Sequence, residues 1–361
     1  MIARMNIGGP AVLVTQLLNE LDRAQFETIL ITGYCENNEA EYAPLQHSTF
    51  PVHRVPSLGR GIRFLGDAKA MIDTRRALKA FRPDIVHTHT AKAGVIGRLS
   101  AFSLRRRPTI VHTFHGHVLS GYFSPRVTSA IAKLEAILAK ITDRIVVVGD
   151  SIGTDLLKAG IGKPDQYVTI APQVTMDDLP DRASARTELG LDQNKPVVAF
   201  VGRLTGIKRP ELFLEVAEQL HALDLDIQFL VVGDGEQRQQ LEAFAKENNL
   251  PVTFTGWLDD PRTAYAAMDL LLLTSANEGR PLTVLEALFT CTPVLATDVG
   301  SLRELDDPSL TLTRVDTDPR DFSQLAAKAL SEANRSNVLQ TTTLSHSSTS
   351  EHTKLYRQLK N

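Results

Sequence analysis

Short apolar runs rich in β-branched residues recur along the whole chain and alternate with amphipathic segments of helix length. Runs such as Ile145–Val148 and Phe229–Val232 are apolar at every position, which is typical of parallel strands covered on both faces. Strands that alternate with helices predict parallel sheets built from β–α–β units. The expected fold class is therefore α/β, with doubly wound parallel sheets.

The same pattern gives the expected elements. We expect strands at Met1–Arg4, Glu27–Gly33, Asp84–His87, Thr109–Phe114, Arg144–Val148, Val168–Ala171, Val197–Val201, Ile227–Val232, Val252–Thr255, Leu270–Thr274 and Val294–Ala296. We expect helices at Ala11–Leu21, Ile62–Phe81, Arg126–Ala139, Pro210–Leu223 and Glu236–Asn248.

With 361 residues, the chain has the length of two domains. Prolines, glycines and charges accumulate in Pro172–Lys195, which we expect to be the linker into the second sheet. We therefore expect a Rossmann-like domain at 1–172, a second at 173–335, and a tail at 336–361 that returns to the first. Within the tail, Thr341–Ser350 is expected to be a loop and Glu351–Leu359 a short helix. Ligands of such folds usually bind in the cleft between the domains, at the carboxyl ends of the strands.

Composition excludes several classes of function. Lys and Arg number 39 against 42 Asp and Glu, a net charge of −3 that argues against a nucleic-acid partner. The cysteines, Cys35 and Cys291, lie far apart and fit neither a disulfide framework nor a thiolate zinc site. No apolar run reaches the ~18 residues that span a bilayer, and the first residues do not resemble a secretory signal. We expect a cytoplasmic protein.

Two cations follow the strand expected at Val197–Val201. Gly202 and Arg203 come directly after it, and Lys208 lies five residues further on. Two cations at the carboxyl end of a parallel strand suit a diphosphate, and a glycine allows the backbone to approach it closely. The alternative is that Arg203 and Lys208 only decorate a loop and cap the following helix.

A glycine turn follows the strand expected at Ile227–Val232. In Gly233-Asp234-Gly235, backbone N–H groups at a helix start could face an anion. The alternative is an ordinary turn between a strand and a helix.

Two carboxylates follow the strand expected at Leu270–Thr274. Glu278 lies in the loop before a helix expected to begin at Pro281, and Glu286 lies on the second turn of that helix. Carboxylates are acceptor-only groups that suit the vicinal hydroxyls of a sugar or ribose. A helix-dipole role would explain Glu278 without a ligand but explains Glu286 poorly. Together with the basic pair, the three motifs predict a nucleotide-sugar site.

These motifs resemble the donor site of the family-4 retaining glycosyltransferases, whose two-Rossmann-domain architecture is called GT-B. The resemblance covers residues 1–315 approximately and includes the glycine loop Asn6–Ala11. The segments His87–His89, Thr113–His117 and Gly121–Phe123 resemble a subgroup that builds capsular, exopolysaccharide or O-antigen chains. One departure is Pro172–Thr175, where many relatives have a glycine and an aspartate.

The resemblance implies a role for each matching residue. Arg203 and Lys208 would hold the donor diphosphate, and Glu286 would hold the ribose hydroxyls. Glu278 and His115 would contact the transferred sugar and, with the two cations, form the catalytic set. The other donor-site residues implied are Gly8, Gly9, Gly202, Gly233, Gly235, Leu258, Gly279, Arg280, Pro281 and Leu282. No metal and no cofactor are implied, because the substrate is itself a nucleotide-diphosphate sugar. The implied acceptor is a glycan or a polyprenyl-diphosphate-linked sugar.

Five histidines lie within thirty-one residues. These are His87, His89, His112, His115 and His117. Zinc ligation is one interpretation, although no cysteine or acidic ligand lies nearby in the sequence. We expect His112, in mid-strand, to be structural and His115, at a strand end, to be functional.

A basic group in the first domain comprises Arg75, Arg76, Lys79, Arg82 and Arg105–Arg107. It is either a solvated face or a contact with anionic lipid headgroups, which would place the protein on the inner face of the membrane.

The sequence therefore predicts a glycosyltransferase of surface polysaccharide synthesis. Three rivals stay open: a non-hydrolysing nucleotide-sugar epimerase of the same fold, a glycoside hydrolase that uses Glu278 and Glu286, and a nucleotide-sugar-binding protein that has lost catalysis.

Overall fold

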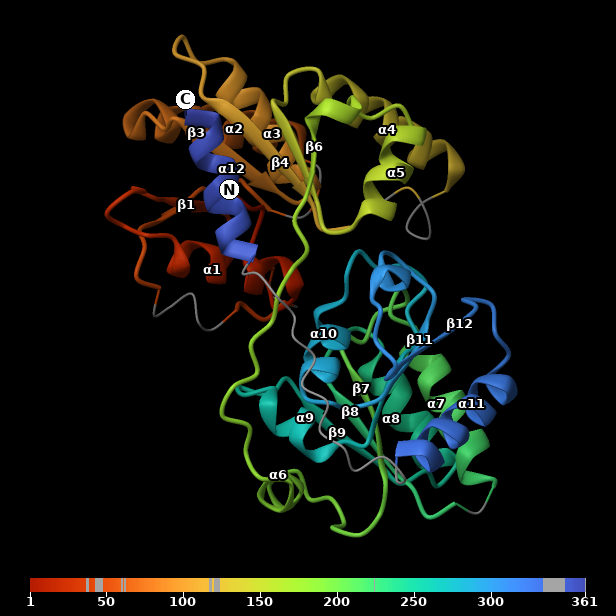
Figure 1. Cartoon of the computed structure of the whole chain (residues 1–361). Helices are drawn as coiled ribbons and strands as arrows, with labels where there is room; N and C mark the ends of the chain where they lie inside the picture. The colour runs from red at the N-terminus through yellow and green to blue at the C-terminus, as the bar shows by residue number, and fades with distance from the viewer. Residues whose placement is uncertain are drawn as a thin grey trace. The chain divides into compact units, whose positions relative to one another are not determined.

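The structure is a computed structural model of the chain and describes residues 1–36, 39–42, 48–59, 61, 63–116, 119, 124–223, 225–333 and 348–360. The chain divides into two compact units (Figure 1). The first comprises Met1–Pro172 and Ser345–Asn361, and the second comprises Gln173–Leu344.

The first unit contains a parallel sheet. Its strands are β1 (Leu30–Thr32), β2 (Val52–Arg54), β3 (Ile85–His89), β4 (Thr109–Phe114), β5 (Arg144–Val147) and β6 (Tyr167–Thr169). Ile2 bridges to Thr32 and to His89, so it joins the β1–β2 pair to the β3–β4–β5–β6 sheet. The strand expected at Met1–Arg4 is wrong in extent. It is reduced to this single bridge because the chain continues into the loop before α1 (Gly9–Glu20).

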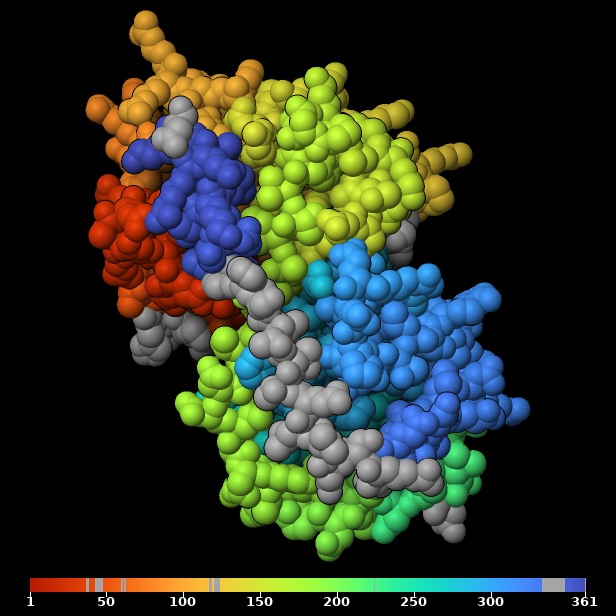
Figure 2. All heavy atoms as spheres, in the orientation of Figure 1, coloured from red at the N-terminus to blue at the C-terminus, as the bar shows by residue number. Residues whose placement is uncertain are grey.

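Helices cover both faces of this sheet. The helices are α1, α2 (Phe64–Phe81), α3 (Ala91–Phe102), α4 (Pro125–Ala139), α5 (Asp150–Lys158) and α12 (Ser348–Lys360), with a 3₁₀ turn at Pro164–Gln166. Leu355 of α12 packs with Val111 and Val146, whereas Ile96 of α3 packs with Ile110, which directly precedes Val111 in β4. Because successive side chains of a strand alternate between faces, α12 and α3 cover opposite sides of the sheet. Figure 2 shows α12, in dark blue, beside the red N-terminal segment that contains α1.

The second unit contains a six-stranded parallel sheet in the order β12-β11-β10-β7-β8-β9. The strands are β7 (Val197–Val201), β8 (Gln228–Val232), β9 (Val252–Gly256), β10 (Leu270–Leu273), β11 (Val294–Thr297) and β12 (Leu310–Thr313). The helices are α6 (Arg182–Glu188), α7 (Pro210–His221), α8 (Arg238–Glu247), α9 (Arg262–Ala267), α10 (Leu282–Phe289) and α11 (Pro319–Ala333), with a 3₁₀ turn at Leu302–Glu304. The strand order reverses between β7 and β10, which makes that pair a topological switch point.

The segment expected to be a linker contains helix α6, so that prediction is wrong in part. Asp181 caps the helix by accepting hydrogen bonds from the N–H groups of Ala183 and Ser184. Arg186 is buried and donates to the carbonyls of Gln193 and Lys195 and to the Asp269 carboxylate. These bonds attach α6 to the second unit.

Within the described residues, no helix is long and apolar enough to cross a membrane.

Candidate nucleotide-sugar site

The loops after β7 and β10 lie side by side because their strands are neighbours in the sheet. The N–H of Ala276 donates to the carbonyl of Ile207 (2.8 Å), and the hydroxyl of Thr274 donates to the carbonyl of Lys208 (2.9 Å). The switch point therefore brings together two predicted motifs that lie seventy residues apart.

Lys208 and Glu278 meet directly at this point. The Lys208 Nζ lies 2.5 Å from Oε1 of Glu278, and the Ser275 hydroxyl donates to the same oxygen over 2.6 Å. Only 20% of the Lys208 side chain and 11% of the Glu278 side chain are exposed. An ammonium has three donors, so this pairing leaves Lys208 donors for a second anion and leaves Oε2 of Glu278 as an acceptor.

Arg203 is half-buried at the start of the same loop. The next residue, Leu204, donates its N–H to the carbonyl of Asp234 (3.0 Å), which fixes the loop against the turn after β8. The proposal that Lys208 caps helix α7 does not fit, because the residue at the N-cap of α7 is Arg209.

The glycine turn after β8 serves close packing. A Cβ at Gly233 would lie 1.9 Å from the carbonyl oxygen of Gly202, and one at Gly235 would lie 2.4 Å from that of Leu204. The Gly233 N–H donates a hydrogen bond to the carbonyl of Gly256, and the Gly235 N–H donates one to the Asp234 carboxylate. Both N–H groups have partners inside the protein, as in an ordinary turn between a strand and a helix, and the assignment of Gly233 and Gly235 to the donor site stays a prediction.

Glu286 lies on α10 and accepts a 2.5 Å hydrogen bond from the hydroxyl of Tyr265, which lies on α9. Burial raises the pKa of the Glu286 carboxyl, and the Tyr265 hydrogen bond opposes that rise. The bond occupies Oε2, so Oε1 is the oxygen left for a ligand hydroxyl. Tyr265 is not predicted from the sequence, because a tyrosine on a short helix does not indicate which residue it contacts.

The other predicted residues of this unit surround these groups. Pro281 is the N-cap of α10 rather than its first residue, and Leu282 is buried as the first residue of that helix. The Gly279 carbonyl accepts from the N–H of Ser301 (2.8 Å), and Arg280 lies 3.6 Å from Glu304. Leu258 is partly buried against the core of the unit.

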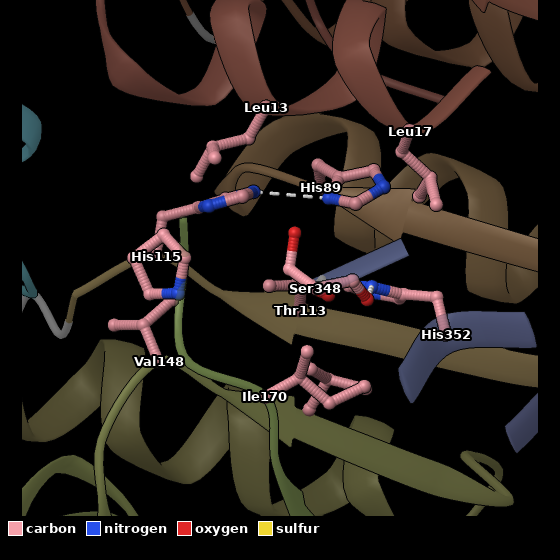
Figure 3. Close-up of a pocket in the computed structure, with 11 residues that line it drawn as sticks. Leu13, Leu17, His89, Thr113, His115, Val148, Ile170, Ser348 and His352 are labelled. Atoms are coloured by element: carbon pink, nitrogen blue, oxygen red, sulfur yellow. Dashed lines mark hydrogen bonds between the residues drawn. The ribbon is translucent and has the colours of Figure 1, made fainter. Parts of the chain in front are cut away.

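The predicted residues of the first unit lie at the carboxyl ends of its strands. Gly8 and Gly9 begin α1, and His115 follows β4 with its Nε2 2.9 Å from Nδ1 of His89 (Figure 3). His115 lines a cavity of about 30 Å³ together with Leu13 and Leu17 of α1.

The structure describes His112 but not His117. His112 is buried on the other face of β4, and its Nδ1 is 2.8 Å from the hydroxyl of Thr88, so its structural role is confirmed. His117 and Gly121–Phe123 lie outside the described residues. In the part of the chain that the structure describes, no group of three or more His, Cys, Asp or Glu side chains could hold a metal ion.

Two family profiles match the chain. The family described as Glycosyltransferase Family 4 matches residues 7–174, and the family described as Glycosyl transferases group 1 matches residues 181–343. The chain belongs to the family-4 glycosyltransferases.

Named relatives share about a third of the residues in the regions that align with this family-4 glycosyltransferase. An Escherichia coli protein named UDP-Gal:alpha-D-GlcNAc-diphosphoundecaprenol alpha-1,3-galactosyltransferase is 32% identical over 260 residues, which cover 68% of this chain and 66% of the relative. A D-inositol 3-phosphate glycosyltransferase of Nocardia farcinica is 32% identical over 238 residues, covering 61% of this chain and 52% of the relative. The matched regions thus span less than two thirds of these relatives' length.

Solved structures share the fold of this family-4 glycosyltransferase. Anabaena HepE, solved with UDP and glucose, has a TM-score of 0.78 at 19% identity and covers 99% of this chain and 98% of its own. WaaG, a glycosyltransferase involved in lipopolysaccharide biosynthesis, has a TM-score of 0.70 at 19% identity, with 92% and 89% covered. The predicted GT-B fold, with two Rossmann-like parallel-sheet domains, is confirmed.

Proposed function

We propose that this protein transfers a sugar from a nucleotide-diphosphate sugar to a glycan or lipid-linked acceptor, with retention at the anomeric carbon. The observation that carries the proposal is the Lys208–Glu278 pair at the switch point of the second sheet, with Glu286 on the adjoining helix. Switch points are where open α/β sheets bind nucleotides.

The residues divide the reaction between them. Lys208 and Arg203 neutralise the diphosphate, whose negative charge grows as its bond to the anomeric carbon breaks and the electron pair leaves with it. Glu286 accepts hydrogen bonds from the ribose hydroxyls through its Oε1. Glu278 accepts from a hydroxyl of the transferred sugar through Oε2, while its Oε1 holds Lys208 in place. The family resemblance assigns His115 to the transferred sugar as well.

The Escherichia coli relative suggests the substrate class. Its name specifies a UDP-sugar donor and a diphosphoundecaprenol-linked acceptor. We extend both classes to this chain and propose a UDP-sugar donor and a polyprenyl-diphosphate-linked acceptor, in the synthesis of a surface polysaccharide.

A lipid-linked acceptor requires access to a membrane, and helices α2, α3 and α4 provide a matching surface. Residues 63–107 and 124–144, which contain them, carry fifteen Lys and Arg against five Asp and Glu, in a chain whose net charge is −3; of these charged residues, Arg98 and Glu135 form a buried pair. Exposed apolar side chains lie among these charges: Leu99 (38% exposed), Phe102 (49%) and Ile137 (60%). Basic surfaces with exposed apolar groups favour the interface of an anionic bilayer. We propose that this surface holds the protein on the membrane.

Two experiments test these proposals. A thermal-shift panel of UDP, GDP and ADP identifies the donor nucleotide, because a ligand at about 100 times its Kd adds roughly 2.7 kcal/mol of stability. We expect UDP to give the largest shift; no shift with any of the three would contradict the nucleotide site.

Flotation with vesicles tests the membrane surface. We expect co-flotation with phosphatidylglycerol vesicles, loss of it with phosphatidylcholine alone, and loss of it in a Phe102→Ser, Arg105→Glu double variant. Arg314→Glu in the second unit is the control and should float like the parent, since Arg314, like Arg105, is exposed but lies outside the surface. Equal flotation of both variants would refute the assignment.

A further inference from the structure

The histidines at the carboxyl ends of β3 and β4 occupy one face of the first sheet. In the pairing of β3 with β4, His89 lies opposite Thr113, and His115 lies two residues beyond Thr113. Since side chains two residues apart point to the same face of a strand, His87, His89, Thr113 and His115 all face the side covered by α1 and α12. The register of β3 against β4 thus produces the contact between His89 and His115.

Most polar groups on this face already have partners. The hydroxyl of Tyr356 is 2.5 Å from Nδ1 of His87, and Nε2 of His87 is 2.6 Å from the hydroxyl of Thr113. His352 of α12 places its Nδ1 2.8 Å from the carbonyl of Ser348. His89 is therefore the side chain left to pair with His115, and the two rings also stack with centroids 5.1 Å apart.

His115 has one bonded nitrogen and one buried nitrogen. Its Nε2 is bonded to His89, whereas its Nδ1 is buried without a hydrogen-bond partner among the described residues. Burial lowers the pKa of both rings, so each is neutral at pH 7 and carries one N–H. An unpaired N–H is rarer in protein interiors than an unpaired acceptor, so the proton of His115 belongs on Nε2.

We propose that His89 is a positioning residue for His115: it accepts the Nε2–H of His115, fixes that tautomer and ring orientation, and leaves Nδ1 of His115 as the acceptor for a hydroxyl of the donor sugar. The pairing of the two rings stands on the structure of the first unit alone. The role toward the sugar rests on the proposed function.

The direct test is long-range ¹H–¹⁵N NMR of protein labelled with ¹⁵N-histidine, because the nitrogen shifts distinguish a protonated from an unprotonated ring nitrogen. A His115→Gln variant assigns the signals. We expect His115 to be protonated at Nε2 in the parent and in His89→Asn, whose side-chain oxygen can replace Nδ1 of His89 as acceptor. In His89→Leu the single tautomer should be lost.

Tyr356→Phe is the matched control, because Tyr356 is buried in the same cluster and contacts His87 but has no hydrogen bond to His115. Its His115 spectrum should equal that of the parent. A His115 protonated at Nδ1 in the parent, or a spectrum that His89→Leu leaves unchanged, would overturn the proposal. If His89→Leu does not fold, altered His115 shifts in His89→Asn would overturn it equally.

Kinetics test the role toward the sugar. We expect kcat to fall about 10²-fold in His89→Leu, with a much smaller change in the KM of the donor, since misplacing a reacting group by about 1 Å has this effect. His89→Asn should recover most of kcat, and Tyr356→Phe should retain it. A His89→Leu enzyme with parental kcat would refute the positioning role. A parent that turns over no nucleotide sugar while its His115 shows the expected tautomer would refute the proposed function and leave the pairing intact.

Discussion

The hydroxyl of Tyr265 donates a 2.5 Å hydrogen bond to Oε2 of Glu286 and so links α9 to α10. Tyr265 is buried, and burial raises the pKa of both side chains. A hydrogen bond donated to a carboxylate stabilises its charged form. The Tyr265 hydrogen bond therefore opposes the effect of burial on the Glu286 carboxyl and fixes one of its oxygens, which leaves the other able to accept a hydrogen bond from a diol.

Replacing Glu286 should weaken nucleotide binding. Glu286→Ala removes a charge-assisted interaction with the ribose that is worth about 1.5–3 kcal/mol. Calorimetric titration with UDP should show this loss while the melting transition persists. Tyr265→Phe keeps the Glu286 carboxylate, so its UDP affinity should fall less than that of Glu286→Ala. Equal UDP affinity in Glu286→Ala and the parent would reject the ribose role.

Replacing Lys208 should affect turnover more than folding. Preorganised groups that stabilise charge in the transition state are worth about 10²–10³ in rate. We expect the rate of sugar transfer to fall by that factor in Lys208→Ala, with a larger change in kcat than in donor affinity. The control is Lys195→Ala, because Lys195 also pairs with a carboxylate of the second unit, that of the exposed Asp226. Near-parental turnover in a folded Lys208→Ala protein would place the diphosphate elsewhere.

Sugar transfer should not depend on a divalent metal. Arg203 and Lys208 supply two positive charges beside the expected position of the diphosphate, so its charge can be neutralised by side chains. Turnover measured in excess EDTA should equal turnover without it. A loss that only magnesium, manganese or zinc restores would show that the leaving group needs a metal ion.

Stability should fall between neutral and mildly acidic pH. Burial lowers the pKa of His87, His89 and His112, and lowers that of His115 to about 4, against about 6.5 in the unfolded chain. Below pH 6.5 the unfolded chain binds protons that the folded chain does not, so the stability present above pH 6.5 is lost toward pH 4. Each such histidine contributes about 1.4 kcal/mol per pH unit within that window. Melting temperatures from pH 7.5 to 5 should therefore decrease, and less steeply in His112→Leu; an identical slope would contradict this origin.

The fold could be predicted because several central strands, namely β5, β7, β8 and β10, are strongly apolar runs. The strands that were missed, β2 and β12, are short and partly exposed, and β12 alternates threonine with leucine. Helix α6 was missed because its sequence is polar apart from alanine, and its stability comes from the cap at Asp181 and the buried Arg186. The cap is a single local residue and the Arg186–Asp269 contact is tertiary, so neither leaves a periodic pattern.

The site could be predicted only in part. The sequence places Lys208 and Glu278 after separate strands, but their direct contact depends on β7 and β10 being neighbours, which the strand order decides. The positions of Gly233 and Gly235 were predicted, whereas the bond from the Gly233 N–H to the carbonyl of Gly256 follows from the packing of two loops. Tyr265 contacts Glu286, which lies 21 residues away in the sequence, so no local motif identifies it.

The central claim is tested most directly by following one reaction by ¹H NMR. A UDP-sugar with an α-linked diphosphate is incubated with the protein and a GlcNAc-diphosphopolyprenol acceptor, and the anomeric protons are recorded over time. The proposed function predicts that the donor signal is replaced by that of a new α-glycoside, with UDP released in equal amount. Epimerised sugar without a glycoside, a β-linked product, or an unchanged donor would contradict the assignment of this chain as a retaining glycosyltransferase.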